Sequence, residues 1–156
     1  METRRIRQTE AEAVTDLWDE AARSVPDGGP LKERGRRNIA AMLALAASHP
    51  RAACFVAVEH ERPVGLAMAE LDEGLLPGRA GLIAELYARG DGTTEGALAE
   101  AAIAWLWEQG AGVIRSEVPL DGPGGELLEA LGFEPESVRY GLYRDDCRTA
   151  GASATL

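Results

Sequence analysis

The chain has 156 residues, of which 46% are hydrophobic and 27% charged, a balance typical of one soluble globular domain and not of a disordered, collagen-like or fibrous protein. The 16 Lys and Arg against 26 Asp and Glu give a net charge of −10 at pH 7, which repels phosphate backbones and argues against a nucleic-acid partner. No apolar run approaches the roughly 20 residues that cross a bilayer. No apolar signal region follows the N-terminal arginines either, so we expect a cytoplasmic protein without a membrane partner.

The first third of the chain predicts one short strand and two amphipathic helices. A strand is expected over 4–8, and Thr9 with Glu12 three positions later has the form of a capping box that opens the first helix. Apolar residues then recur at i, i+3 and i+4 until the segment 26–30, whose prolines and glycines end the helix. A second helix is expected over 31–48.

The rest of the domain alternates strands with helices. Residues 54–58 and 63–69 predict a hairpin around a polar turn at 60–62. The elements expected after it are a strand over 82–87, a helix over 95–109, a strand over 113–118, a short helix over 124–131 and a last strand over 138–144. Because a long helix connects the strands around Leu86 and Val113, we expect these two strands to run parallel.

Residues 1–146 are predicted to form the domain, and the small and polar residues 147–156 a flexible C-terminal tail. Cys54 and Cys147 lack the spacing of metal ligands, so no metal site is predicted. Large apolar rings at helical positions are usually buried, which assigns Trp18, Trp105 and Trp107 to the core.

Four short segments carry a family resemblance. Val58 to Gly65 covers the turn of the hairpin, Ile83 to Tyr87 the following strand, Trp105 to Gly110 the end of the long helix, and Leu131 to Pro135 the end of the last helix. Together with the order of the strands and helices, they resemble the GNAT superfamily of acyl-CoA-dependent N-acetyltransferases over nearly the whole domain. The resemblance implies an α/β fold with a mixed, mostly antiparallel sheet and helices on both faces. It also implies acetyl-CoA as the co-substrate.

The coenzyme site that the resemblance implies begins at the end of the strand 82–87. The strand backbone there would hold the pantetheine arm, and the loop after it would present N–H groups at a helix N-terminus to the diphosphate. In the family this loop has the form R/Q-x-x-G-x-G/A, of which Arg89 and Gly92 match the first two defined positions while Thr94 replaces the last. A second register places Gly90, Thr93 and Glu95 at the signature positions. The residues implied in coenzyme binding are Leu86, Tyr87, Ala88, Arg89, Gly90, Gly92, Thr93 and Thr94.

Two carboxylates fall in or beside this loop. Asp91 and Glu95 stand where the diphosphate would bind, and like charges about 4 Å apart repel by roughly 1 kcal/mol even in water. We therefore expect weaker coenzyme binding than is usual in the family, with Arg89 as the favourable charge. The Thr93-Thr94 pair is also explained as a helix cap, with or without a coenzyme.

The candidate catalytic residues are one glutamate and two tyrosines. The resemblance implies that Glu85 draws a proton from the amine through water, whereas simple alternation along the strand could equally turn it to a polar face. Leu128 stands in place of the tyrosine that usually protonates the departing thiolate of the coenzyme. That replacement leaves Tyr140 and Tyr143, on the last predicted strand, as candidate general acids.

Acidic residues around the first two helices could line a cleft for a cationic acceptor, although charge on the solvated face of amphipathic helices is the commoner explanation. They are Asp16, Asp19, Glu20, Asp27 and Glu33. The resemblance implies transfer of an acetyl group from acetyl-CoA to a primary amine of a small molecule or peptide, and the acidic net charge favours a cationic amine. The alternative is a GNAT-shaped ligand-binding or regulatory module that has lost catalysis. A homodimer is left open.

Overall fold

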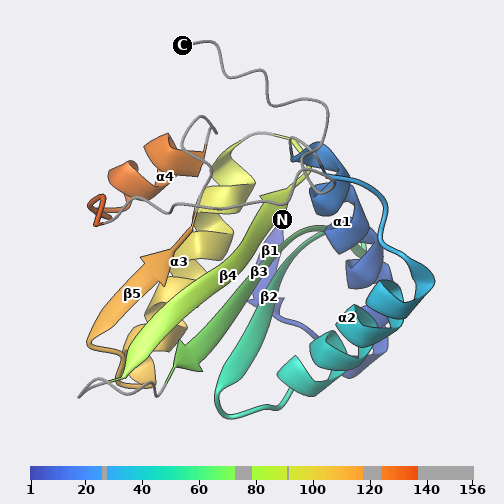
Figure 1. The fold of residues 1–156 in the computed structure, drawn as a ribbon, viewed down its shortest axis with the longest axis horizontal. Helices are drawn as coiled ribbons and strands as arrows, with labels where there is room; N and C mark the ends of the chain where they lie inside the picture. Colours follow the sequence, from blue (N-terminus) through green and yellow to red (C-terminus); the bar gives the residue numbers. More distant parts are fainter. Residues whose placement is uncertain (26–27, 73–78, 91, 118–123, 137–156) are drawn as a thin grey trace, which may run out of the picture.

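Two helical layers enclose a five-stranded sheet in the computed structural model, which describes residues 1–25, 28–72, 79–90, 92–117 and 124–136 (Figure 1). The elements are β1 (Glu2–Arg5), the 3-10 turn η1 (Gln8–Glu10), α1 (Ala11–Ser24), α2 (Glu33–Ala46), β2 (Ala52–Glu59), β3 (Arg62–Asp72), β4 (Ala80–Ala88), α3 (Gly92–Glu108), β5 (Val113–Ser116) and α4 (Gly124–Ala130). The strands lie in the order β1-β2-β3-β4-β5, antiparallel from β1 to β4, while β4 and β5 are parallel. The predicted α/β fold, its mostly antiparallel sheet and the parallel pair are confirmed.

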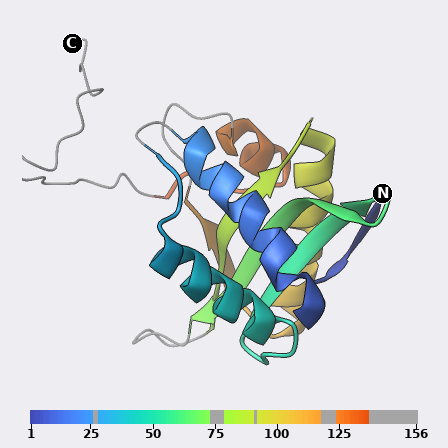
Figure 2. The ribbon, with the colours of Figure 1, turned by 90° about the vertical axis from the view of Figure 1, so that its right-hand side faces the viewer.

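Each face of the sheet has its own apolar core. Helices α1 and α2 lie side by side on one face and α3 on the other (Figure 2). Alternation along β3 builds both cores, because Leu66 and Met68 are buried towards α1 and α2 while Ala67 and Ala69 are buried towards α3. A strand that is covered on both faces therefore appears in the sequence as one continuous apolar run.

The start of the chain differs from the prediction. The first strand is Glu2–Arg5 instead of 4–8, and the capping interaction involves Glu10 instead of the Thr9 and Glu12 pair. The Glu10 carboxylate accepts a hydrogen bond from the Arg7 backbone N–H at 2.8 Å and binds both terminal nitrogens of Arg4 on β1, at 2.9 and 2.6 Å. The guanidinium of Arg4 lowers the pKa of Glu10 to about 2. The Glu10 carboxylate, which caps the 3-10 turn η1, is therefore also bound by Arg4 of β1.

The turn between β2 and β3 holds two non-glycine residues in the left-handed region. His60 has a φ of 47° and Glu61 a φ of 63°. Two-residue hairpins favour this geometry because it matches the twist of the strands, although asparagine and glycine adopt it at lower energy. The hairpin predicted from the sequence is confirmed, with a turn that is locally strained.

Among the candidate core residues, Trp107 is the exception. Its side chain is 50% exposed, so its assignment to the core was wrong. Trp18 packs against the core under α1 and α2, and Trp105 packs against the core under α3. The ring of Trp105 lies edge-on to that of Phe55, with the ring centroids 6.5 Å apart. Cys54 is fully buried beneath α1 and α2, and burial raises the pKa of its thiol to about 12.

Several predictions fall outside the described residues. These are the last strand over 138–144 with Tyr140 and Tyr143, the tail over 147–156 with Cys147, the loop residue Asp91 and the acidic residue Asp27. Of the helices in the described ranges, none is long and apolar enough to span a membrane.

Candidate functional site

A β-bulge in the middle of β4 sets the geometry of the candidate site. Met68 of β3 lies opposite Glu85 and the next residue, Ala69, lies opposite Ile83, so Ala84 is an extra residue without a partner on β3. The bulge interrupts the alternation of the strand. Ile83 belongs to the core under α3, whereas Glu85 shares the face of Met68, which is the face covered by α1 and α2.

The bulge lies where β4 and β5 stop pairing. Their register runs from Ala80 opposite Val113 to Ile83 opposite Ser116, and the Ser116 hydroxyl donates to the Ile83 carbonyl at 3.2 Å. Strand β4 continues to Ala88, and no other strand of the described part of the chain pairs with this edge beyond Ile83. Backbone groups along a strand edge can bind an extended ligand arm, as the expected pantetheine site requires.

Glu85 is half-buried at this bulge. Burial raises the pKa of its carboxyl, and a hydrogen bond from the Leu86 backbone N–H offsets part of the rise. A carboxylate whose pKa is shifted towards neutral pH is better suited to accept a proton than one at its usual value. These properties favour the general-base interpretation over that of a residue turned to a polar face.

The end of β4 leads into α3 through a tight turn. Gly90 has a φ of 101°, a conformation that glycine adopts without strain, and α3 begins at Gly92. Thr93 and Thr94 therefore lie inside the first turn of the helix, and their assignment as caps was wrong. The Thr94 side chain is 8% exposed, and its hydroxyl lies 3.3 Å from the Met1 sulfur.

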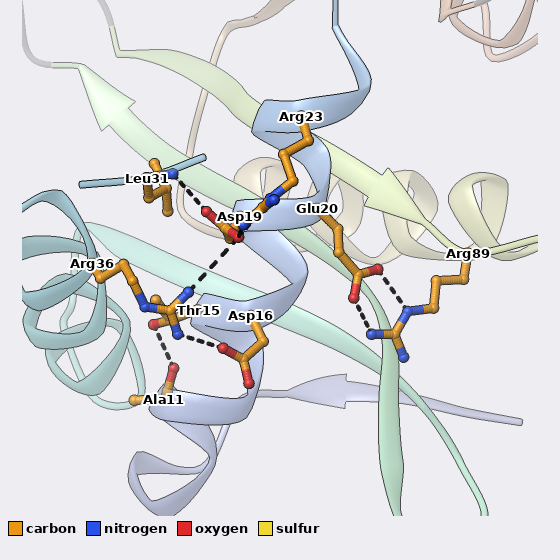
Figure 3. Close-up of polar contacts among 9 residues, drawn as sticks. All are labelled: Ala11, Thr15, Asp16, Asp19, Glu20, Arg23, Leu31, Arg36 and Arg89. Carbon is orange, nitrogen blue, oxygen red and sulfur yellow. Dashed lines mark hydrogen bonds and ion pairs between the residues drawn. The ribbon is translucent and has the colours of Figure 1, made fainter. Parts of the chain in front are cut away.

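Two of the groups expected to contact the coenzyme already have partners in the protein. The Ala88 N–H donates to a carboxylate oxygen of Glu95 at 3.3 Å. Arg89 binds both carboxylate oxygens of Glu20 on α1, with its Nε 2.8 Å from one of them (Figure 3). In each case a side-chain carboxylate of the protein occupies a donor that the expected coenzyme would use.

The sequence identified Glu20 only as one of several acids that could line an acceptor cleft, and its contact with Arg89 was missed. Arg89, which hydrogen-bonds its carboxylate, is the largest cause that lowers the pKa of Glu20. Burial first, and then the charge of Glu20, raises the pKa of Tyr87. One feature of the sequence could have indicated this contact. Glu20 comes three residues after the buried Leu17, so it lies beside the apolar face of α1 that packs on the sheet.

Two other acidic residues of α1, Asp16 and Asp19, form contacts with α2 and the segment before it (Figure 3). Asp19 is 8% exposed, and its carboxylate accepts hydrogen bonds from the Leu31 backbone N–H at 2.6 Å and from Arg23 at 2.9 Å. It thereby fixes the start of the segment that enters α2. Asp16 is exposed and binds Arg36 of α2. These two carboxylates hold the helices together and are not free to line an acceptor cleft.

No general acid stands at the position of Leu128, which is 7% exposed on α4. Across the described residues, no group of three or more His, Cys, Asp or Glu side chains could hold a metal ion. An open, mainly apolar groove of about 410 Å³ lies between α2 and the sheet, and Glu85 is not among its lining residues. It is lined by Asn38, Ala41, Met42, Leu45, Ala46, His49, Ala52, Met68 and Glu70.

No protein-family model and no curated protein matches the sequence. The fold, however, is similar to solved structures over nearly the full length of both chains. The aminoglycoside N-acetyltransferase AAC(6')-Iy in complex with CoA has a TM-score of 0.71 at 19% identity, covering 94% of this chain and 95% of the other. An acetyltransferase from Trypanosoma brucei has a TM-score of 0.68 at 18% identity, covering 92% and 99%. A transcriptional regulator from Bacillus halodurans has a TM-score of 0.72 at 16% identity, covering 92% and 99%. The chain therefore shares the fold of these solved structures, as the family resemblance in the sequence predicts.

Proposed function

We propose that this protein transfers an acetyl group from acetyl-CoA to a primary amine, with Glu85 as the general base. The observation that carries the proposal is the position of Glu85, half-buried and with a raised pKa, next to the edge of β4 that no described strand covers beyond Ile83. The fold supports the reaction class by analogy with the acetyltransferases described above.

The reaction needs a neutral amine, because an ammonium group has no lone pair. Glu85 accepts the ammonium proton through a water molecule, and the amine nitrogen then attacks the carbonyl carbon of the thioester. The new C–N bond forms as the C–S bond breaks, the nitrogen releases its second proton to solvent, and the thiolate leaves. A thiol has a pKa near 8.5, so protonation of the thiolate by solvent is sufficient where no acid is placed. Tyr140 and Tyr143 remain the candidate acids from the sequence.

We assign the coenzyme to β4 and the turn after it. The backbone from Leu86 to Ala88 would hold the pantetheine arm, while Gly90, Gly92 and Thr93 at the start of α3 would face the diphosphate with Arg89. The glycine conformation at Gly90 supports this assignment, since it allows the backbone to approach an anion closely. For the acceptor, the net charge of −10 favours a cationic amine of a small molecule or peptide.

A second candidate function is a ligand-binding or regulatory module without catalysis. It is favoured by the contact between Glu95 and the Ala88 N–H and by the apolar Leu128 in place of an acid. Calorimetric titration with acetyl-CoA, followed by release of free thiol in the presence of a polyamine, an aminoglycoside or a lysine peptide, separates the two. We expect binding and amine-dependent thiol release. Failure of acetyl-CoA to bind, or binding without turnover on any of these amines, would favour the module.

A further inference from the structure

The ion pair between Arg89 and Glu20 joins the end of β4 to the middle of α1. Both oxygens of the Glu20 carboxylate are bound, one at 2.8 Å by the Arg89 Nε and the other by a terminal nitrogen of the same guanidinium. The contact is bidentate and spans 69 positions in the sequence. Each partner is partly exposed, with side-chain exposures of 47% for Arg89 and 38% for Glu20.

Arg89 is also the only Lys or Arg between residues 80 and 114 of the sequence. A diphosphate at the start of α3 would meet the carboxylate of Glu95, and within residues 80–114 of the sequence the guanidinium of Arg89 is the one positive side chain that favours it. A guanidinium presents the same planar fork to a carboxylate as to a phosphate. The fork that now binds Glu20 therefore cannot bind a diphosphate in the same way at the same time.

We propose that Glu20 competes with the coenzyme diphosphate for Arg89, so that coenzyme binding exchanges one bidentate partner of Arg89 for the other and releases Glu20. This inference rests on the proposed function. Glu20 then faces the acceptor side of β4, because α1 covers the face of the sheet on which Glu85 and Tyr87 lie. A released carboxylate at that place attracts an ammonium group. Coenzyme binding thus prepares the site for a cationic acceptor.

The exchange predicts opposite effects of one substitution on the two ligands. Glu20→Gln removes the competing charge, so coenzyme A should bind about fivefold more tightly, in line with the strength of an exposed ion pair. The same variant should raise the KM for a cationic amine because the released carboxylate is missing. A substitution that merely loosened α1 would weaken both.

Three controls isolate the diphosphate. Asp16→Asn breaks the ion pair of α1 with Arg36 and removes a charge that acts on Arg89 only at a distance, so it should change coenzyme A binding less than Glu20→Gln does. Acetyl-pantetheine lacks the diphosphate, so its KM should not respond to Glu20→Gln. Arg89→Gln should weaken coenzyme A binding and abolish the effect of Glu20→Gln in the double variant. The gain in affinity should also shrink at high salt, because screening weakens the ion pair.

The outcomes separate this inference from the proposed function. If the wild type acetylates an amine but Glu20→Gln binds coenzyme A no more tightly, the exchange is refuted and the acetyltransferase proposal stands. If neither the wild type nor Glu20→Gln binds coenzyme A in calorimetry, both proposals fall. If Glu20→Gln binds coenzyme A and the wild type does not, the result would support the proposed competition between Glu20 and the diphosphate for Arg89.

Discussion

The backbone N–H of Ala88 donates a hydrogen bond to the carboxylate of Glu95 at 3.3 Å. The N–H of the last residue of β4 is therefore already bound by a side chain from the first turn of α3. Any ligand arm that uses this amide must displace Glu95. The contact is local in sequence, since seven positions separate the two residues. It shares no side chain with the ion pair between Glu20 and Arg89.

The double variant Asp91→Gly, Glu95→Gly should bind acetyl-CoA more tightly than the wild type, since it frees the Ala88 amide and removes two negative charges. The gain should be larger at low salt because it is electrostatic. The variant should also be about 1 kcal/mol less stable, because glycine inside a helix is unfavourable and a first-turn carboxylate is lost. Calorimetry in two salt concentrations and chemical denaturation measure the two effects. Unchanged affinity at both salts would contradict this account.

Glu85→Gln should lower turnover by about 10²-fold or more while leaving the affinity for acetyl-CoA unchanged, within the range for loss of a general base. The fall in rate at low pH that protonation of Glu85 causes in the wild type should be absent in the variant. Tyr140→Phe and Tyr143→Phe test the candidate acids by the same assay. Full activity of Glu85→Gln on an amine that the wild type acetylates would remove Glu85 from the mechanism.

The same Glu85→Gln variant should be at least as stable as the wild type at neutral pH. Burial raises the pKa of Glu85 above its ordinary 4.5, so the folded state holds the proton more tightly than the unfolded state. The wild type therefore loses stability as the pH rises from 4.5 through the raised folded-state pKa, and the glutamine variant should not. Thermal unfolding of both proteins from pH 4 to pH 8 checks this. A destabilised variant would indicate that Glu85 has a structural role.

Glu10→Gln should destabilise the protein at neutral pH by about 1–2 kcal/mol, an estimate reduced for solvent screening. Arg4 lowers the pKa of Glu10 from 4.5 to about 2, so this stabilisation is complete above pH 4.5 and is lost as the pH falls towards 2. The difference between wild type and variant should narrow over that range in denaturation experiments. Glu12→Gln, at the exposed side of the same helix end, is the matched control and should be nearly neutral. An equal effect of both variants would contradict the assignment.

His60→Asn combined with Glu61→Gly should stabilise the protein by about 1 kcal/mol, because these residues adopt the left-handed turn at lower energy. Val64, three residues after the turn, accepts a hydrogen bond from the Arg89 backbone N–H at 2.8 Å, so coenzyme affinity should be measured together with stability. Thermal unfolding is the measurement. A loss of stability would mean that the two side chains make contacts that outweigh the strain.

The fold could be predicted from the sequence because hydrophobic periodicity and turn residues are local signals. Alternation over the residues of β4, however, would place Ile83, Glu85 and Tyr87 on one face, and the bulge at Ala84 moves Ile83 to the other. A bulge depends on how two strands meet, which no single strand encodes. The pairs Arg4–Glu10 and Glu20–Arg89 were missed for the same reason, since each joins side chains from different elements.

The buried thiol of Cys54 can report on local unfolding of the core between the sheet and helices α1 and α2. The thiolate is the form that reacts with alkylating reagents, and a pKa of about 12 together with complete burial leaves almost none of it exposed in the folded protein. In a Cys147→Ser background, the labelling rate at Cys54 measures how often this half of the core separates from the sheet. Whether coenzyme A slows that rate can then be followed without any assay of acetyl transfer.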